Sequence, residues 1–110
     1  MARDLARGEV RLYHFPPPDK RRPVVILTRS SALRFLNRVT IAPITSTIRS
    51  IPTEIVLGEE DGMKGPCAIN LDHLITVPRE NLGRLVATLP PSRTAEICRA
   101  IAFALECRFQ

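Results

Sequence analysis

Val24-Val25-Ile26-Leu27 is a run of four apolar residues, and three of them are β-branched. Branching at Cβ favours strands, and a strand without polar alternation is typical of one that is covered on both faces. Pro23 is compatible with this strand because a proline can occupy its first position. The run therefore predicts the central, buried strand of a sheet or barrel.

Segments on both sides of this run also have the composition of short strands. Pro43 falls inside one of them and predicts an edge position, a bulge or an early end for that strand. Residues 29–38 fit either a short helical turn or a basic loop. The predicted strands cover residues 9–15, 24–27, 39–44, 54–57, 67–71, 74–77 and 85–88.

The C-terminal part of the chain changes to a helical period. Ser92, which follows Pro90-Pro91, can cap a helix. The apolar residues that recur at three- and four-residue steps, and are expected to face the sheet, are Ile97, Cys98, Ile101, Ala102 and Leu105. Because strands and helices do not alternate, the predicted fold is mainly β with a C-terminal helix: a small curled antiparallel barrel, in one domain spanning residues 1–110.

The charge balance of the chain favours a polyanionic partner. The 110 residues hold 16 Lys and Arg against 11 Asp and Glu, a formal net charge of +5. Guanidinium groups bind phosphate oxygens bidentately, so an arginine-rich surface suits nucleic acid. Composition alone also fits an ordinary basic surface.

Cysteine usage and the first residues predict a cytoplasmic protein. Cys67, Cys98 and Cys107 form neither a C-x-x-C pair nor an even disulfide framework, so we expect reduced thiols that fill apolar space. The chain starts with charged residues that no apolar stretch follows, and no later run is long enough to span a bilayer. We therefore expect neither secretion nor membrane insertion.

Several classes of enzyme lack support in the sequence. His14 and His73 are far apart, and neither stands in a metal-ligand spacing with a cysteine or a carboxylate. Glu59-Glu60-Asp61 is an acidic cluster between glycines, which predicts a solvated surface turn rather than a cation site. Neither a phosphate-binding Gly-rich loop nor a nucleophile elbow is present. We expect no metal and no cofactor.

Basic and hydroxyl-bearing residues flank two of the predicted strands. Lys20-Arg21-Arg22 precedes one buried strand, and Thr45-Ser46-Thr47 with Arg49 follows the next. In RNA the 2′-hydroxyl can attack the adjacent phosphorus, so a cleaving enzyme need only align that attack and stabilise the phosphoryl charge. Thr45 can donate a hydrogen bond to a phosphoryl oxygen, and Arg22 can supply positive charge or pass a proton.

Two alternatives stay open for these residues. The pKa of arginine, above about 12, favours charge stabilisation over proton transfer by Arg22. Both residues also have ordinary roles, since Arg22 can be a solvated charge and Thr45 a strand-end residue that satisfies backbone groups.

The order of short sequence blocks resembles that of the MazF toxin family, also called PemK or Kid. The resemblance runs from about Arg7 to Cys107, and it depends on the blocks together rather than on any single one. The blocks are Arg7-Gly8-Glu9-Val10, Arg22-Pro23-Val24-Val25-Ile26-Leu27, Ala42-Pro43-Ile44-Thr45-Ser46, Pro52-Thr53-Glu54-Ile55 and Leu82-Gly83-Arg84-Leu85.

This resemblance implies a homodimer of SH3-like barrels that cuts single-stranded RNA at short sequence motifs without a metal. The products implied are a 2′,3′-cyclic phosphate and a 5′-hydroxyl. A cognate MazE-like antitoxin is implied as the inhibitor, through an extended acidic segment laid over the RNA groove. The family's catalytic arginine and threonine fall on Arg22 and Thr45. Residues expected to contact RNA are Lys20, Arg21, Arg29, Ser46, Thr47 and Arg49.

The chain departs from the family pattern in two places. The loop of residues 16–21 is short and rich in proline where many members have a longer loop that helps to select bases, so the cleavage motif is not carried over. Thr28-Arg29 replaces the usual Ser or Asn after the apolar strand, which adds a cation.

Two rival functions follow from the same class of barrel. CcdB-like toxins poison DNA gyrase through a C-terminal Trp-Gly-Ile, whereas this chain ends in Cys107-Arg108-Phe109-Gln110 and has no Trp. A basic barrel that binds nucleic acid without cutting it would need Arg22 but not Thr45. Ribonuclease activity is the interpretation that uses both residues.

Overall fold

The computed structural model describes residues 5–18 and 20–107. In this described part of the chain, two helices and two short 3-10 turns accompany the strands. The helices are α1 (Ser30–Leu33) and α2 (Pro91–Ala104), and the 3-10 turns cover Glu59–Asp61 and Arg79–Asn81. The strands are β1 (Glu9–His14), β2 (Arg21–Ile26), β3 (Arg38–Thr45), β4 (Glu54–Leu57), β5 (Cys67–Asn70), β6 (Ile75–Pro78) and β7 (Leu82–Thr88).

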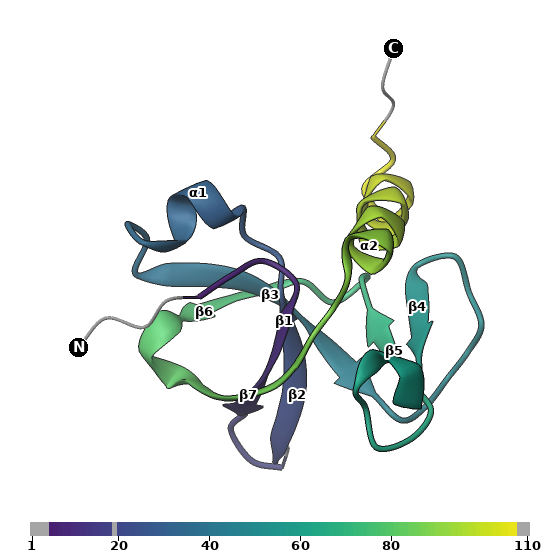
Figure 1. Cartoon of the computed structure of the whole chain (residues 1–110), viewed down its shortest axis with the longest axis horizontal. Coiled ribbons are helices and arrows are strands. Elements are labelled where there is room, and N and C mark those ends of the chain that lie inside the picture. The colour runs from purple at the N-terminus through teal and green to yellow at the C-terminus, as the bar shows by residue number, and fades with distance from the viewer. Residues whose placement is uncertain (1–4, 19, 108–110) are drawn as a thin grey trace.

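The seven strands form one curled sheet in the order β4-β5-β3-β2-β1-β7, with β6 paired to β3 (Figure 1). Every pair is antiparallel. In the described part of the chain the sheet ends at β4 and β7 and does not close. The prediction of a mainly β antiparallel fold with a C-terminal helix is confirmed.

The central strands β2 and β3 separate two hydrophobic cores. Val24, Ile26 and Ile41 belong to one core, while Val25 and Ala42 belong to the other. All five side chains are fully buried, so the run at residues 24–27 is covered on both faces as predicted. Each buried Val or Ile contributes about 1.5–3 kcal/mol relative to an exposed side chain. Strong burial on both faces fixes the register of these two strands, because a one-residue slip would exchange the cores.

The two prolines in the central strands do not lie where the sequence predicted. Strand β2 starts at Arg21, so Pro23 is inside it; pairing with β3 runs from Val24 to Ile26, which leaves Pro23 outside that ladder. Strand β3 is central rather than an edge. Its partner on one side changes from β6, at residues 38–41, to β5, at residues 44–45. Pro43 pairs with Val24 of β2 and lies at that change, where neither β5 nor β6 pairs with it.

The helical segments settle one alternative and correct one expectation. The open choice for residues 29–38 resolves to the single helical turn α1. Helix α2 starts at Pro91 with Pro90 as its N-cap, so Ser92 is not the cap. A proline at the first helical position needs no hydrogen-bond acceptor and has φ already set, which explains the earlier start.

The buried face of α2 differs from the predicted one. Ile97 and Ala100 are buried and Ile101 packs against the same core, whereas Cys98 and Leu105 are exposed. Helix α2 contacts β4 (Figure 1). The inward stripe is therefore narrower than the apolar spacing suggested.

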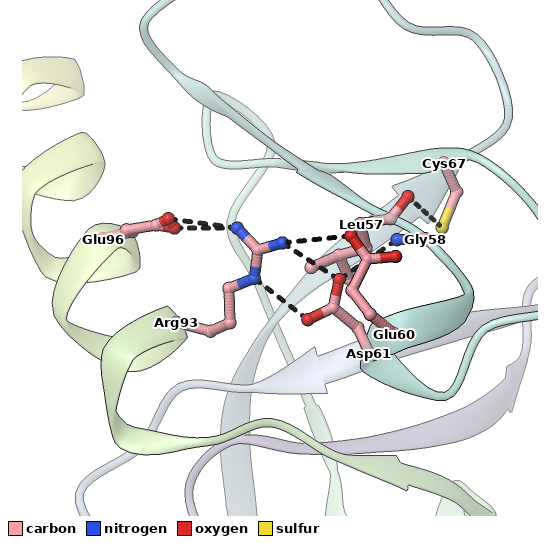
Figure 2. Close-up of polar contacts among 7 residues, drawn as sticks. All are labelled: Leu57, Gly58, Glu60, Asp61, Cys67, Arg93 and Glu96. Atoms are coloured by element: carbon pink, nitrogen blue, oxygen red, sulfur yellow. Dashed lines mark hydrogen bonds and ion pairs between the residues drawn. The ribbon is translucent and has the colours of Figure 1, made fainter.

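An ion-pair network joins the acidic turn to α2 (Figure 2). Arg93 Nε and Nη2 donate to the two carboxylate oxygens of Asp61, each at 3.0 Å, and Nη1 donates to Glu96 at 2.8 Å. Asp61 Oδ2 also accepts the Gly58 N–H. The hydrogen bonds from Arg93 lower the pKa of Asp61, although burial opposes them. The prediction that this acidic cluster is a solvated turn is wrong for Asp61, whose side chain is only 4% exposed.

Cys67, Cys98 and Cys107 form no disulfide, and they do not share one environment. Cys67 is buried as predicted, while Cys98 and Cys107 are exposed, so the expectation of buried filler is wrong for those two. Burial raises the pKa of the Cys67 thiol, which keeps it protonated near neutral pH.

No helix among residues 5–18 and 20–107 has the length and apolar character that crossing a membrane requires.

Candidate functional site

Arg22 and Thr45 lie opposite each other on adjacent strands. Strands β2 and β3 pair as Val24 with Pro43 and Ile26 with Ile41. Extending this antiparallel register by two residues places Arg22 across from Thr45. Residues directly opposite in such a pair point to the same face, with Cβ atoms about 4.5–5.5 Å apart. The guanidinium and the hydroxyl can therefore reach one ligand.

Two cavities share this pair of residues. The first has a volume of about 380 Å³, and the second about 440 Å³. The first is lined by Phe15, Arg22, Pro43, Thr45, Thr47, Arg49, Glu54, Asn70, His73 and Ile75. The second is lined by Leu12, Arg22, Pro23, Ile44, Thr45, Ser46, Met63, Lys64, Gly65, Pro66, Cys67, Arg84 and Val86. A ligand held between Arg22 and Thr45 can thus extend into a cavity on either side.

The Thr45 hydroxyl is held in place by the turn that follows it. The Thr47 N–H donates to Thr45 Oγ1 at 3.1 Å. Because the oxygen accepts this bond from the backbone, its own proton can be donated away from the chain. Thr45 is half-buried at the end of β3, so the hydroxyl has a defined direction and remains open to a ligand.

Glu54 positions the loop that carries Arg49. Glu54 is 8% exposed, and its Oε1 accepts the backbone N–H of Arg49 at 2.9 Å and of Ser50 at 3.2 Å. Ser50 has a φ of 57°, in the left-handed region that non-glycine residues seldom adopt. The carboxylate therefore stabilises a strained turn and directs this loop over the first cavity.

The other residues predicted to contact RNA fall into two groups. Thr47 and Arg49 line the first cavity and Ser46 lines the second, next to Arg22 and Thr45. The remaining three, Lys20, Arg21 and Arg29, line neither cavity. Lys20 is exposed in the loop that connects β1 to β2. Arg21 pairs with His14 and lines a separate cavity of about 320 Å³. Arg29 follows the far end of β2, away from Arg22.

Sequence reasoning missed several residues that line these cavities. Glu54 was considered only as part of a strand, and His73 only as a metal ligand. Phe15 and Asn70 join the first cavity, and Lys64 joins the second. These residues come from β4, β5 and the loops beside β1, β5 and β6, which only the pairing of distant strands brings beside Arg22, so sequence spacing alone could not identify them.

Comparison with known proteins identifies the family of the chain. A family model described as PemK-like, MazF-like toxin of type II toxin–antitoxin systems matches residues 6–105. The chain belongs to this toxin family. The resemblance inferred from the short sequence blocks is therefore confirmed, and Arg22 and Thr45 both lie within the matched region.

Relatives and solved structures of MazF toxins cover nearly the whole chain. Endoribonuclease MazF3 of Mycobacterium tuberculosis is 36% identical over 97 residues, which cover 88% of this chain and 94% of that protein. The structure of Mycobacterium tuberculosis toxin MazF-mt6 has a TM-score of 0.84 at 33% identity and covers 92% of this chain and 99% of its own. The structure of an endoribonuclease in complex with its cognate antitoxin, from Mycobacterial species, also has a TM-score of 0.84, at 25% identity. This match covers 96% of this chain and 99% of that one.

Proposed function

We propose that this MazF-like toxin cuts single-stranded RNA at the phosphodiester held between Arg22 and Thr45. The chain is a toxin endoribonuclease, as its family membership and its similarity to relatives named endoribonucleases support. The observation that carries the assignment of the site is that Arg22 on β2 and Thr45 on the neighbouring strand β3 line the same two cavities.

In this mechanism the 2′-oxygen of the RNA attacks its own 3′-phosphorus. A bond forms between the 2′-oxygen and phosphorus, and the bond from phosphorus to the 5′-oxygen breaks. The products are a 2′,3′-cyclic phosphate and a 5′-hydroxyl. Negative charge grows on the two phosphoryl oxygens that do not bridge nucleosides, and preorganised donors beside them lower the barrier.

Arg22 and Thr45 are those donors. The Thr45 hydroxyl, oriented by the Thr47 N–H, donates to one phosphoryl oxygen. The Arg22 guanidinium supplies positive charge and donors to the phosphoryl group. Arginine side chains hold their proton firmly, so Arg22 stabilises charge and does not transfer a proton. No metal ion takes part in these steps.

The cavities on either side of the pair accommodate the neighbouring nucleosides. Arg49 and Thr47 offer contacts in the first cavity, and Ser46 and Lys64 offer contacts in the second. Apolar side chains such as Met63 provide a surface on which a base can pack.

The partners of the chain are RNA and a cognate antitoxin, as in the neighbouring complex described with its antitoxin. A homodimer of single toxin domains spanning residues 1–110 remains the expected assembly. The cytoplasm, which holds cellular RNA and keeps thiols reduced, is the proposed site of action.

Purified protein is expected to cut total cellular RNA in excess EDTA. Mapping the cut ends should find a 2′,3′-cyclic phosphate and a 5′-hydroxyl at a recurring short motif. In a synthetic RNA with that motif, a single 2′-deoxy nucleotide on the 5′ side of the cut should block cutting, because it removes the nucleophile. Cutting that depends on Mg²⁺, cutting that survives the deoxy substitution, or tight RNA binding without cutting would each contradict the proposal.

A further inference from the structure

His73 lies in the cavity that contains Arg22 and Thr45, and the mechanism above gives it no role. The residue belongs to the turn between β5 and β6. Strand β5 pairs with β3 at Ile44, and β6 pairs with β3 at Ile41, so this turn runs alongside residues 42–43. The His73 backbone N–H donates to the Asn70 carbonyl at 3.4 Å, which closes the turn. The His73 side chain is exposed and lines the cavity.

The position of the turn brings His73 close to the proposed scissile phosphate. Pro43 and Thr45 are alternate residues of one strand, so they share a face and lie about 7 Å apart. A side chain from the turn beside Pro43 can therefore reach a phosphodiester held at Thr45. This places an imidazole next to a phosphate whose charge Arg22 and Thr45 already stabilise.

The cavity needs a proton donor that the other charged side chains do not supply. When the bond to the 5′-oxygen breaks, the electron pair stays on that oxygen, which must gain a proton to leave as a hydroxyl. Guanidinium groups such as those of Arg22 and Arg49 are poor general acids, and the Oε1 of Glu54 already accepts two backbone N–H groups. Imidazole is the side chain that gives up and regains a proton most readily near neutral pH.

We propose that His73 is the general acid that protonates the leaving 5′-oxygen. As the 2′-oxygen bonds to phosphorus, its own proton passes to a solvent water. The 5′-oxygen departs with its electron pair and takes the proton from the imidazolium of His73. The neutral imidazole then regains a proton from solvent. This inference rests on the proposed function, since it assigns a step of the same reaction.

A sulfur leaving group provides the test. In an RNA whose 5′-bridging oxygen at the cut site is replaced by sulfur, the departing thiolate needs no proton. His73→Gln keeps a hydrogen-bonding side chain but cannot act as an acid, and His73→Ala removes both properties. On the oxygen substrate we expect both variants to slow cutting by about 100-fold or more, and on the sulfur substrate to stay within about threefold of the unaltered toxin.

His14→Gln is the matched control, because His14 is also exposed but lies on β1 and does not line the cavity with Arg22. It should cut both substrates at the unaltered rate. All variants should have the same unfolding temperature as the unaltered toxin. Normal cutting of the oxygen substrate by His73→Gln, or an equal loss on both substrates, would overturn the assignment of His73. Failure of the unaltered toxin to cut either substrate would instead count against the proposed function.

Discussion

Replacing Arg22 with alanine is expected to slow RNA cutting by about 1,000-fold, the upper end of the loss that follows removal of one preorganised donor from such a site. The loss should appear in the rate of the chemical step, because the guanidinium stabilises charge that grows on the phosphoryl oxygens. Arg22 is exposed at the start of β2, so the variant should unfold at the unaltered temperature. Single-turnover cutting of a short RNA measures the effect.

Two further variants separate the local role of Arg22 from the loss of one positive charge. Arg99→Ala makes the same change in net charge on the exposed side of α2 and should cut normally. Arg22→Lys keeps the charge but loses the bidentate contact, so its rate should lie between those of Arg22→Ala and the unaltered toxin. Equal cutting rates for Arg22→Ala and Arg99→Ala would contradict this local role and would show that only the total charge matters.

Replacing Asp61 with alanine is expected to lower the free energy of unfolding by about 3 kcal/mol, the lower end for breaking a buried ion pair. The change leaves the Arg93 guanidinium without its two-oxygen partner and the Gly58 N–H without an acceptor. The lower end applies because the Arg93 side chain is 23% exposed and water can screen part of its charge. Urea unfolding at neutral pH measures the effect.

Glu96→Ala is the matched control for this network. Glu96 contacts the same guanidinium, but its side chain is 32% exposed, so its loss should cost only about 0.5 kcal/mol. Equal losses for Asp61→Ala and Glu96→Ala would contradict the view that burial makes the Asp61 pair the main attachment of α2 to the turn.

The stability contribution of Asp61 should also depend on pH in a defined direction. The hydrogen bonds from Arg93 hold the pKa of Asp61 in the folded protein below the ordinary aspartate value of about 4. As the pH falls below that value, the unfolded chain takes up the proton first, and folding loses stability until the folded-state pKa is passed. The difference in the free energy of unfolding between the unaltered toxin and Asp61→Ala should therefore have its full size above about pH 5 and should shrink below about pH 4.

The parts of the fold that were predictable depend on local patterns. The β-branched run at Val24 indicates a strand covered on both faces, and the proline pair at the start of α2 marks the change to a helix. The errors at Asp61 and Pro43 have a common cause, since they concern partners distant in sequence. Nothing near Asp61 indicates that Arg93 will bury it, and Pro43 looks like an edge residue unless the change from β6 to β5 is known.

The candidate site divides in the same way. Arg22 and Thr45 were proposed from their chemistry and from the family blocks, and the strand register then brings them opposite each other. Glu54 joins them from β4 and His73 from the β5–β6 turn, because β5 pairs with both β3 and β4, and sequence distance gives no indication of this closeness. Arg29 was proposed for its charge, yet the direction of β2 carries it away from Arg22.

A double-mutant cycle in single-turnover cutting tests most directly whether Arg22 and Thr45 act on one phosphodiester. Thr45→Ala alone should slow cutting by about 100-fold. Because both groups stabilise the same transition-state charge, the double variant should cut about as slowly as Arg22→Ala alone, far faster than the product of the two losses would give. Losses that multiply, or full activity in either single variant, would contradict a shared site.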